Sequence, residues 1–390
     1  MVSTLARPTA TRTYLTNATV VLPDRTLHDG AVLVEEGLIT AICPDAIHGH
    51  AQEVDLESDI LMPGIIDLHG DAIEREMEPR ERARLPLPHA VLQGDRKCAL
   101  AGITTMFHAL AFVGEKTGKR SYTRMTEVAR LIRARAETSV VDNRIHCRFE
   151  MTSPAGMPYI KDLIDEGLCE MMSLNNHSPG QGQYRDLSIY RQYMKGNYNI
   201  PDAEIDRIIA ERIKDAEGAE GYAEEMADYT LRAGIPLASH DDDDGDKVRL
   251  RHSQGSSISE FPLTLDAAQT ATTLGMHAIV GSPNVMRGGS TGTGASALDL
   301  VAQGVANCLC SDYAPSTMLP ATFQIAHALD WPLHRAALLT TTNPAAAARL
   351  QDRGAITVGM QADLIAVREY DGVPAVRCLW SRGRHGLRFY

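Results

Sequence analysis

Imidazole, carboxylate and amide side chains recur in this chain directly after short apolar segments. In chain order these residues are His69 and Asp71, His108, Glu150, His177, His240, Glu260, Asn284 and Asp312. Histidine and carboxylate groups are suitable ligands for a borderline divalent cation such as zinc or manganese. If the apolar segments are strands that end on one side of the fold, their polar ends converge there. The pattern therefore predicts a metal site.

His69 and Asp71 are the first such pair and close the segment LMPGIIDLHGD (61–71). Residues two apart in a strand point to the same side, so this spacing places an imidazole and a carboxylate on one face. A polar strand terminus without a metal is the alternative interpretation of the pair taken alone. The apolar strand that enters from a Pro-Gly turn favours the metal site.

The middle of the chain alternates between short strands and longer helical stretches, which must position these side chains. The expected strands are GIIDLHGD, GITTMFHAL, RIHCRFEM, EMMSLNNHS, IPLASHDD, SISEFPL, AIVGSPNV and NCLCSDY, with helices such as TRMTEVARLIRARAE and AEEMADYTLRAG between them. Eight strand–helix units over roughly 290 residues fit an α/β fold, the (β/α)8 TIM-like barrel, whose strand ends meet on one face. A doubly wound open sheet is the alternative, but no GxGxxG follows the first strand.

Both ends of the chain consist of short β-like runs separated by turns, such as YLTNATVVL near the start and AVRCLWSRGR near the end. We therefore expect one small β-sandwich domain formed by both termini. Its parts are residues 1–62 and 351–390, and the barrel takes residues 63–350 between them.

The net charge of -12 argues against broad binding to nucleic acid or to an anionic membrane. No run of about 18 apolar residues is long enough to span a membrane. The N-terminal residues lack the apolar stretch of a secretory signal. The seven cysteines include no CxxC pair, so we expect reduced thiols and a cytoplasmic protein. The oligomeric state stays open, and a homo-oligomer is compatible with the sequence.

Several motifs are similar to those of a known enzyme family. The β-rich start followed by PGIIDLH, together with the closing GAITVGMQADLIAV, resembles the amidohydrolase superfamily, in which HxH is the usual form and Asp71 here replaces the second His. The segments SLNNHSPGQGQY (173–184), LASHDDDD (237–244), GSPNVMRGGS (281–290) and CSDYAP (310–315) resemble, in order and spacing, the phosphonate-metabolism amidohydrolases known as the PhnM family. The resemblance runs from about residue 13 to about residue 388.

The resemblance implies a reaction and a set of roles. The family hydrolyses alpha-D-ribose 1-methylphosphonate 5-triphosphate to the 5-phosphate and pyrophosphate, the step before carbon–phosphorus bond cleavage. By this resemblance the metal ligands are His69, Asp71, Glu150, His177, His240 and Asp312, with Glu150 bridging two ions per subunit. A structural ion pair of Glu150 with Arg148 or another base is the alternative. Zinc is favoured over manganese and iron. Metal-bound hydroxide would attack phosphorus, with Asp312 as general base.

Phosphate recognition is expected from the segment Arg287-Gly288-Gly289-Ser290. Glycines permit close backbone approach, their N–H groups can form an anion nest, and Arg287 adds a bidentate donor. A flexible loop is the alternative. Arg80 is a weaker second candidate. Gln181 and Tyr184 would hydrogen-bond the ribose or the phosphates, or belong to a turn that only orients His177.

The remaining polar residues are left with two interpretations each. Asp241 follows His240 and would fix its imidazole by a hydrogen bond, or belong to a solvated loop. Asp242–Asp244 are expected to be solvated or to form a weak cation site. His108 and Glu260 are each as well suited to a hydrogen-bonding wall as to a ligand, and His89 and Asp95 favour structural roles. Another amidohydrolase activity, such as a cyclic amidase or a deaminase, is the main functional alternative. A catalytically inactive scaffold protein is the other.

Overall fold

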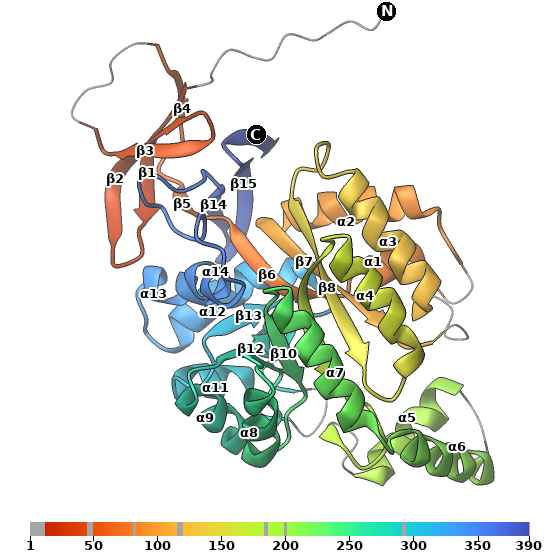
Figure 1. The fold of residues 1–390 in the computed structure, drawn as a ribbon. Helices are drawn as coiled ribbons and strands as arrows, with labels where there is room; N and C mark the ends of the chain where they lie inside the picture. Colours follow the sequence, from red (N-terminus) through yellow and green to blue (C-terminus); the bar gives the residue numbers. More distant parts are fainter. Residues whose placement is uncertain are drawn as a thin grey trace, which may run out of the picture.

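The computed structural model describes residues 12–44, 50–80, 83–114, 120–182, 186–198, 201–290 and 294–389. These residues form two eight-stranded sheets, one in a barrel and one in a smaller domain built from both ends of the chain (Figure 1). The expected fold, a barrel with a smaller β domain formed by both termini, is confirmed.

The barrel consists of eight parallel strands in sequential order. They are β6 (Ile65–Gly70), β7 (Ile103–Phe112), β8 (Asp142–Glu150), β9 (Cys169–Asn175), β10 (Leu237–His240), β11 (Ile258–Glu260), β12 (His277–Gly281) and β13 (Cys308–Cys310). A parallel bridge between Gly70 and Asp312 brings the last strand back to the first. Each of the eight expected strands is therefore confirmed, and their carboxyl ends meet at one mouth.

Helices connect the barrel strands and cover their outer faces (Figure 1). They are α1 (Ile73–Met77), α2 (Leu87–Leu100), α3 (Tyr122–Ala134), α4 (Met157–Asp165), α5 (Leu187–Tyr198), α6 (Asp202–Asp215), α7 (Ala219–Arg232), α8 (Gly245–Ser253), α9 (Leu265–Thr273), α10 (Ser282–Arg287), α11 (Ala297–Ala302), α12 (Met318–Ala328), α13 (Leu333–Ala337) and α14 (Thr342–Ala347). Short 3-10 turns lie at Pro154–Gly156 (η2), Pro315–Thr317 (η4) and Leu338–Thr340 (η5). Figure 1 shows α5 and α6 projecting beyond this outer layer.

The helix α3 illustrates how the sequence produces these elements. Ser121 caps its N-terminus by accepting a hydrogen bond from the backbone N–H of Arg124. Its buried residues Met125, Val128, Ala129 and Ile132 follow the 3.6-residue period of a helix with one apolar face. This face packs in the cluster that also holds the outward side chains of β8. The predicted helix over TRMTEVARLIRARAE is thus confirmed for most of its length.

The small domain joins the two termini through one hydrogen-bonded sheet. Its strands are β1 (Arg12–Val21), β2 (Thr26–Glu35), β3 (Leu38–Ile42), β4 (Gln52–Asp55), β5 (Ile60–Pro63), β14 (Leu364–Tyr370), β15 (Val373–Ser381) and β16 (Arg384–Arg388). The antiparallel pairing of β5 with β14 connects the two ends of the chain. The sheet buries an apolar cluster of its own that includes Leu15, Val32, Leu61, Leu364 and Trp380.

Arg353 lies at the base of the barrel, where the strands begin. Its Nη1 donates to the Asp142 carboxylate at 2.7 Å and to the Thr105 hydroxyl at 3.0 Å, and its Nε donates to Asp352 at 2.9 Å. A further carboxylate, that of Asp363, is 3.7 Å away. This buried cation therefore ties the C-terminal segment to the first residues of β7 and β8.

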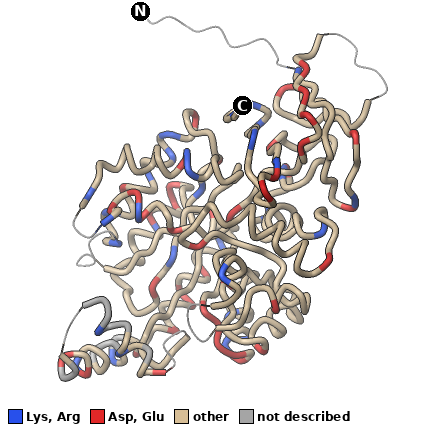
Figure 2. Tube along the Cα trace, turned by 180° about the vertical axis from the view of Figure 1, so that it is seen from behind, with Lys and Arg blue, Asp and Glu red and all other residues tan. Residues whose placement is uncertain are grey.

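The structure shows where the charged residues and the cysteines of this chain lie. Figure 2 shows acidic and basic residues interspersed along most of the trace. None of the seven cysteines, all of which are among the described residues, forms a disulfide, and six of them are buried. Within the described residues, no helix combines the length and apolar character that a membrane crossing requires.

Candidate active site

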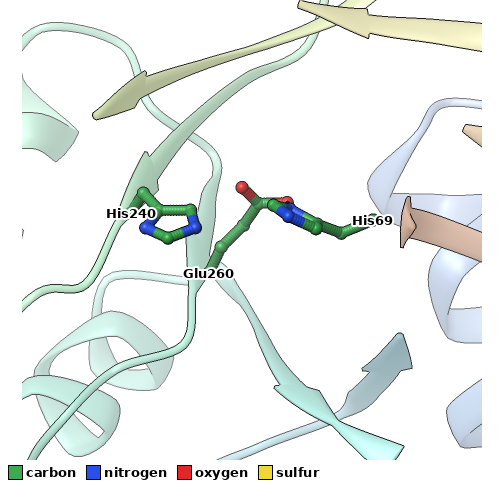
Figure 3. Close-up of side chains that lie close together, drawn as sticks. All are labelled: His69, His240 and Glu260. Carbon is green, nitrogen blue, oxygen red and sulfur yellow. The ribbon is translucent and has the colours of Figure 1, made fainter. Parts of the chain in front are cut away.

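The deepest group at the barrel mouth consists of His69, His240 and Glu260, from the ends of β6, β10 and β11. One ligand atom from each lies within 4.8 Å of the others. His69 Nδ1 is 3.0 Å from Glu260 Oε1, and all three residues are buried. Figure 3 shows the Glu260 carboxylate against the His69 ring, with the His240 ring beside them. Two imidazoles and a carboxylate in this arrangement suit a divalent cation.

His146, which the sequence analysis did not single out, completes this inner group. Its ring centroid is 5.2 Å from that of His69, and its Nδ1 donates to the Leu68 carbonyl at 3.1 Å. Burial lowers the pKa of His146 to about 3, so the imidazole is neutral and its Nε2 is an acceptor. This Nε2 faces Glu260 Oε2 at 3.8 Å, and neither atom has a hydrogen-bond partner.

An outer group lies beside the inner one and shares His240 with it. Ligand atoms of His177, His240 and Asp241 come within 4.8 Å of one another. Glu150 at the end of β8 joins them, because its Oε2 is 2.6 Å from His177 Nδ1 and its Oε1 accepts from the His177 backbone N–H. Burial raises the pKa of Glu150, but His177 more than offsets this effect, so the carboxyl stays ionised.

Asp71 and Asp312 lie where the barrel closes. The Asp312 N–H donates to the His69 carbonyl at 2.9 Å, and the Asp71 N–H donates to the Asp312 carbonyl at 2.8 Å. Burial and the neighbouring Asp71 carboxylate raise the pKa of Asp312 to about 7. Gly70 leaves room for its neighbours here, since a Cβ there would lie 2.0 Å from the terminal methyl of Met106 and 2.9 Å from Ser311 Oγ.

Several residues at the mouth have left-handed backbone conformations. Asp241, Phe261 and Asp312, which follow β10, β11 and β13, each have a φ of 53°. Such values are uncommon for residues with a side chain and are frequently found at functional sites. These conformations turn the chain sharply just after the strand ends. Asp241 and Asp312 are themselves polar residues of the site, and Phe261 directly follows Glu260.

The structure does not bring every expected strand-end residue to the mouth. His108 is buried, and its ring Nε2 is 2.8 Å from the Asn143 Oδ1. Its neighbours Met106 and Cys98 line a cavity of about 770 Å³ between α1, α2 and β15, which lies outside the barrel. Asn284 lies in α10, where its Oδ1 accepts from the Ala297 backbone N–H. Both were expected at strand ends on the active face, and this expectation is wrong, because strand alternation and a helix direct them elsewhere.

His89 and Asp95, for which the sequence favours structural roles, lie away from the site. His89 is exposed on α2. Asp95 is buried, and its carboxylate accepts from the backbone N–H groups of Val140 and Val141 and from the Asn143 side chain. It therefore holds the entry of β8 rather than the active site.

The expected anion nest is wrong for the two glycines after α10. The Gly288 N–H donates to the Val285 carbonyl, and the Gly289 N–H donates to the Asn284 carbonyl. These N–H groups close the helix, with Gly288 at a φ of 75°, and are not free to bind an anion. Arg287 is the last residue of α10 and is exposed. Its guanidinium donates to the Tyr313 hydroxyl at 2.9 Å.

The other phosphate candidates lie outside the inner groups. Arg80 and Gln181 are exposed. The Gln181 backbone N–H donates to the Ser178 carbonyl, which makes it part of the turn that follows His177. Tyr184 lies outside the described residues.

The Asp241–Asp244 run divides into separate roles. Asp241 is buried, with its Oδ1 3.4 Å from His240 Nδ1. The expectation of a solvated Asp242 is wrong, because it is fully buried and accepts from the hydroxyls of Ser239 and Ser259, at 2.5 Å each. Asp244 caps α8 by accepting from the Lys247 N–H. Charge repulsion is relieved at Asp242 and Asp244, because each of these two carboxylates accepts from donors of its own.

The missed residues His146 and Arg148 had a signal in the sequence. In RIHCRFE, Ile145, Cys147 and Phe149 alternate with polar residues. The three apolar side chains pack against the surrounding helices, so the residues between them face the barrel interior. Period-two alternation within β8 therefore identifies inward residues of the site that a search of strand ends alone does not find.

Comparisons with known proteins agree with this arrangement. No family model matches the chain. Over 378 residues it is 32% identical to the alpha-D-ribose 1-methylphosphonate 5-triphosphate diphosphatase of Escherichia coli (strain K12), a match that covers 95% of the chain and 99% of that relative.

Solved structures of other enzymes share the fold. The N-acetylglucosamine-6-phosphate deacetylase of Pasteurella multocida gives a TM-score of 0.64 at 13% identity, covering 96% of this chain and 99% of that one. The 5-methylcytosine deaminase of Klebsiella pneumoniae gives 0.64 at 15% identity, covering 97% and 98%. At these identities the likeness concerns the fold alone. The sequence match across nearly the whole of both chains is what identifies the chain as a hydrolase that belongs to the alpha-D-ribose 1-methylphosphonate 5-triphosphate diphosphatase family.

Proposed function

We propose that this chain hydrolyses alpha-D-ribose 1-methylphosphonate 5-triphosphate to the 5-phosphate and pyrophosphate, as part of phosphonate breakdown. The observation that carries the proposal is the match to the diphosphatase of Escherichia coli, which spans nearly the whole of both chains. The two groups of histidines and carboxylates at the barrel mouth support it, because metal-assisted hydrolysis needs such a site.

The chemistry of the inner group fits a divalent cation. The His146 Nε2 acceptor and the Glu260 Oε2 face each other without a hydrogen donor between them. Two buried acceptors in this position repel each other, and a cation that both atoms approach would remove the conflict. The two unpartnered acceptor atoms therefore favour a metal site over a site held together by hydrogen bonds alone.

We assign two ions per subunit to the two groups, with zinc favoured because imidazole nitrogens and carboxylate oxygens together are ligands that it accepts. His69, His240 and Glu260 would hold the inner ion, with His146 beside them. His177, Glu150 and Asp241 would hold the outer ion. Asp71 and Asp312, at the closure of the barrel, stay in the proposed ligand set. Asp241 thus has a proposed ligand role in place of one that only fixes His240.

A bound divalent ion would lower the pKa of water and neutralise charge on the phosphoryl oxygens. The chain supplies the proton acceptor, because Asp312 has a pKa raised to about 7 and lies beside Asp71 at the mouth. A general base is most effective when its pKa is near the working pH. As water attacks a phosphorus atom of the triphosphate, an Asp312 carboxylate oxygen takes its proton. The bond from that phosphorus to the bridging oxygen breaks, and pyrophosphate leaves.

Phosphorus NMR of the metal-loaded protein with the triphosphate tests the proposal. Pyrophosphate and a 5-monophosphate should appear together in equal amounts, and His240→Ala should form neither. Production of three inorganic phosphates, or no turnover by a fully metal-loaded and folded protein, would contradict the proposed reaction. In that case cyclic-amide and amino-heterocycle substrates become the next to assay.

A further inference from the structure

The inward face of β8 carries an unbroken series of polar residues from the base of the barrel to its mouth. Strand alternation places Asp142, Arg144, His146, Arg148 and Glu150 on this face, since Ile145, Cys147 and Phe149 pack outward. His146 contacts His69, and Glu150 bonds His177, so Arg148 lies between two residues of the proposed metal site.

Arg148 is buried but has no protein partner among the described residues. It is 8% exposed, and its Nε lacks any hydrogen-bond partner. Glu150, the carboxylate two residues away, is bonded to His177 and Thr152 instead. A buried guanidinium without a counter-ion is costly, so an unpaired one needs a reason to be retained.

The Arg148 charge acts on the catalytic groups. Burial raises the pKa values of Asp312 and Glu260, and the positive charge of Arg148 opposes this rise in both. The guanidinium is therefore within electrostatic reach of the proposed general base and of the inner metal group.

Arg144 provides the contrast on the same face of the same strand. Its Nε donates to the Asp142 carboxylate at 3.0 Å, and its Nη1 is 3.9 Å from Glu170. The arginine toward the base is thus paired with carboxylates of the chain, whereas the arginine toward the mouth is not.

We propose that Arg148 binds the phosphoryl oxygens of the substrate inside the active site. It would take the phosphate-binding role that the sequence predicted for Arg287, which is exposed. The inference rests on the proposed function for its substrate. A guanidinium presents a planar fork of donors that matches a phosphate oxygen pair. Because it lies between His146 and Glu150 on the inward face of β8, it would stabilise the charge that the phosphoryl oxygens carry as the bond to pyrophosphate breaks.

The experiment compares three variants of the metal-loaded protein, Arg148→Gln, Arg148→Lys and the matched control Arg144→Gln. Pyrophosphate affinity is measured by calorimetry, kcat/KM by release of pyrophosphate, and metal content by mass spectrometry. We expect Arg148→Gln to lose affinity at least about tenfold and kcat/KM about 100-fold or more, with full metal content. Arg148→Lys should recover part of the affinity, because it keeps the charge without the fork. Arg144→Gln should bind pyrophosphate as the unaltered protein does.

The outcomes separate this inference from the proposed function. If Arg148→Gln keeps both its pyrophosphate affinity and its kcat/KM, the phosphate role is overturned. The phosphate role is also overturned if both Arg148→Gln and Arg148→Lys lose metal and their pyrophosphate affinity falls only in proportion to that loss. If the unaltered protein binds pyrophosphate through Arg148 but does not turn over the triphosphate, the reaction proposed above fails and the anion site stands.

Discussion

Two buried arginines at opposite ends of the barrel differ in whether other residues bond them. Arg353 at the base is 6% exposed and bonds Asp142, Asp352 and Thr105. Arg148 at the mouth is 8% exposed, and no hydrogen bond or ion pair joins it to another described residue. The two side chains have the same charge and nearly the same burial, so only their partners differ.

This contrast reflects the division of labour in a (β/α)8 barrel. Residues at the strand beginnings stabilise the fold, whereas residues at the strand ends bind and react. A fully paired charge can be buried without large loss, but an unpaired one lowers stability until a ligand arrives. The mouth of this barrel also contains the orphaned His146 Nε2 and Glu260 Oε2. At the mouth, the unsatisfied polar atoms thus lie among the residues proposed to hold the metal.

The strongest test of the mouth is His240→Ala, because His240 belongs to both metal groups. We expect loss of most bound metal and a fall in kcat/KM of about 1,000-fold or more, since metal assistance supplies several kcal/mol. Metal content and turnover are measured on the same sample.

The matched control is His108→Ala, which removes a buried histidine that faces away from the site. It should keep its metal even if its stability falls. Full metal content in His240→Ala, or equal metal loss in both variants, would break the distinction between the two positions.

Replacing each arginine by Met tests the comparison directly through the free energy of unfolding, measured with urea. Arg353→Met leaves buried carboxylates without their cation and should lose about 3–5 kcal/mol. Arg148→Met removes an unpaired charge, so the substrate-free protein should be unchanged or more stable by about 1 kcal/mol. Equal destabilisation by both changes would show that Arg148 is a structural residue.

The pH dependence of the metal-free protein tests the environment of Asp312. Its pKa is raised from 3.8 to about 7, so the folded state holds a proton that the unfolded state releases. The contribution of this group to stability is present below about pH 4 and is lost as pH rises to about 7. Between pH 5 and pH 7, wild type should lose about 2–3 kcal/mol more than Asp312→Asn. Parallel profiles for the two proteins would mean that Asp312 titrates normally.

The smallest expected effect is at the rim. Arg287 is exposed and already bonded to Tyr313, so a phosphate contact there is weakened by solvent. Arg287→Ala should raise KM by roughly tenfold or less and leave the metal content unchanged. A larger loss of kcat than that caused by Arg148→Gln would reverse the assignment of the two arginines. Arg80→Ala serves as the exposed control.

Local patterns in the sequence were sufficient for the fold. Apolar runs with polar ends correctly predicted all eight barrel strands, and the apolar periodicity of residues such as Met125 and Val128 correctly predicted a helix. The short β-like segments at both ends correctly predicted a sheet shared by the termini. These signals depend on side-chain periodicity within one element, which a sequence displays directly.

The site needed more than local pattern. The sequence predicted that His69, Glu150, His177 and His240 lie close together, because residues at the strand ends of a barrel meet at its mouth. Only the tertiary structure decided that Glu260 faces His69, that His108 faces outward and that the Gly288 N–H closes a helix. Only it decided that Arg353 is paired and Arg148 is not. Partners such as Asp142 and Arg353 are distant in sequence, and their pairing depends on how strands twist and close, which no local period encodes.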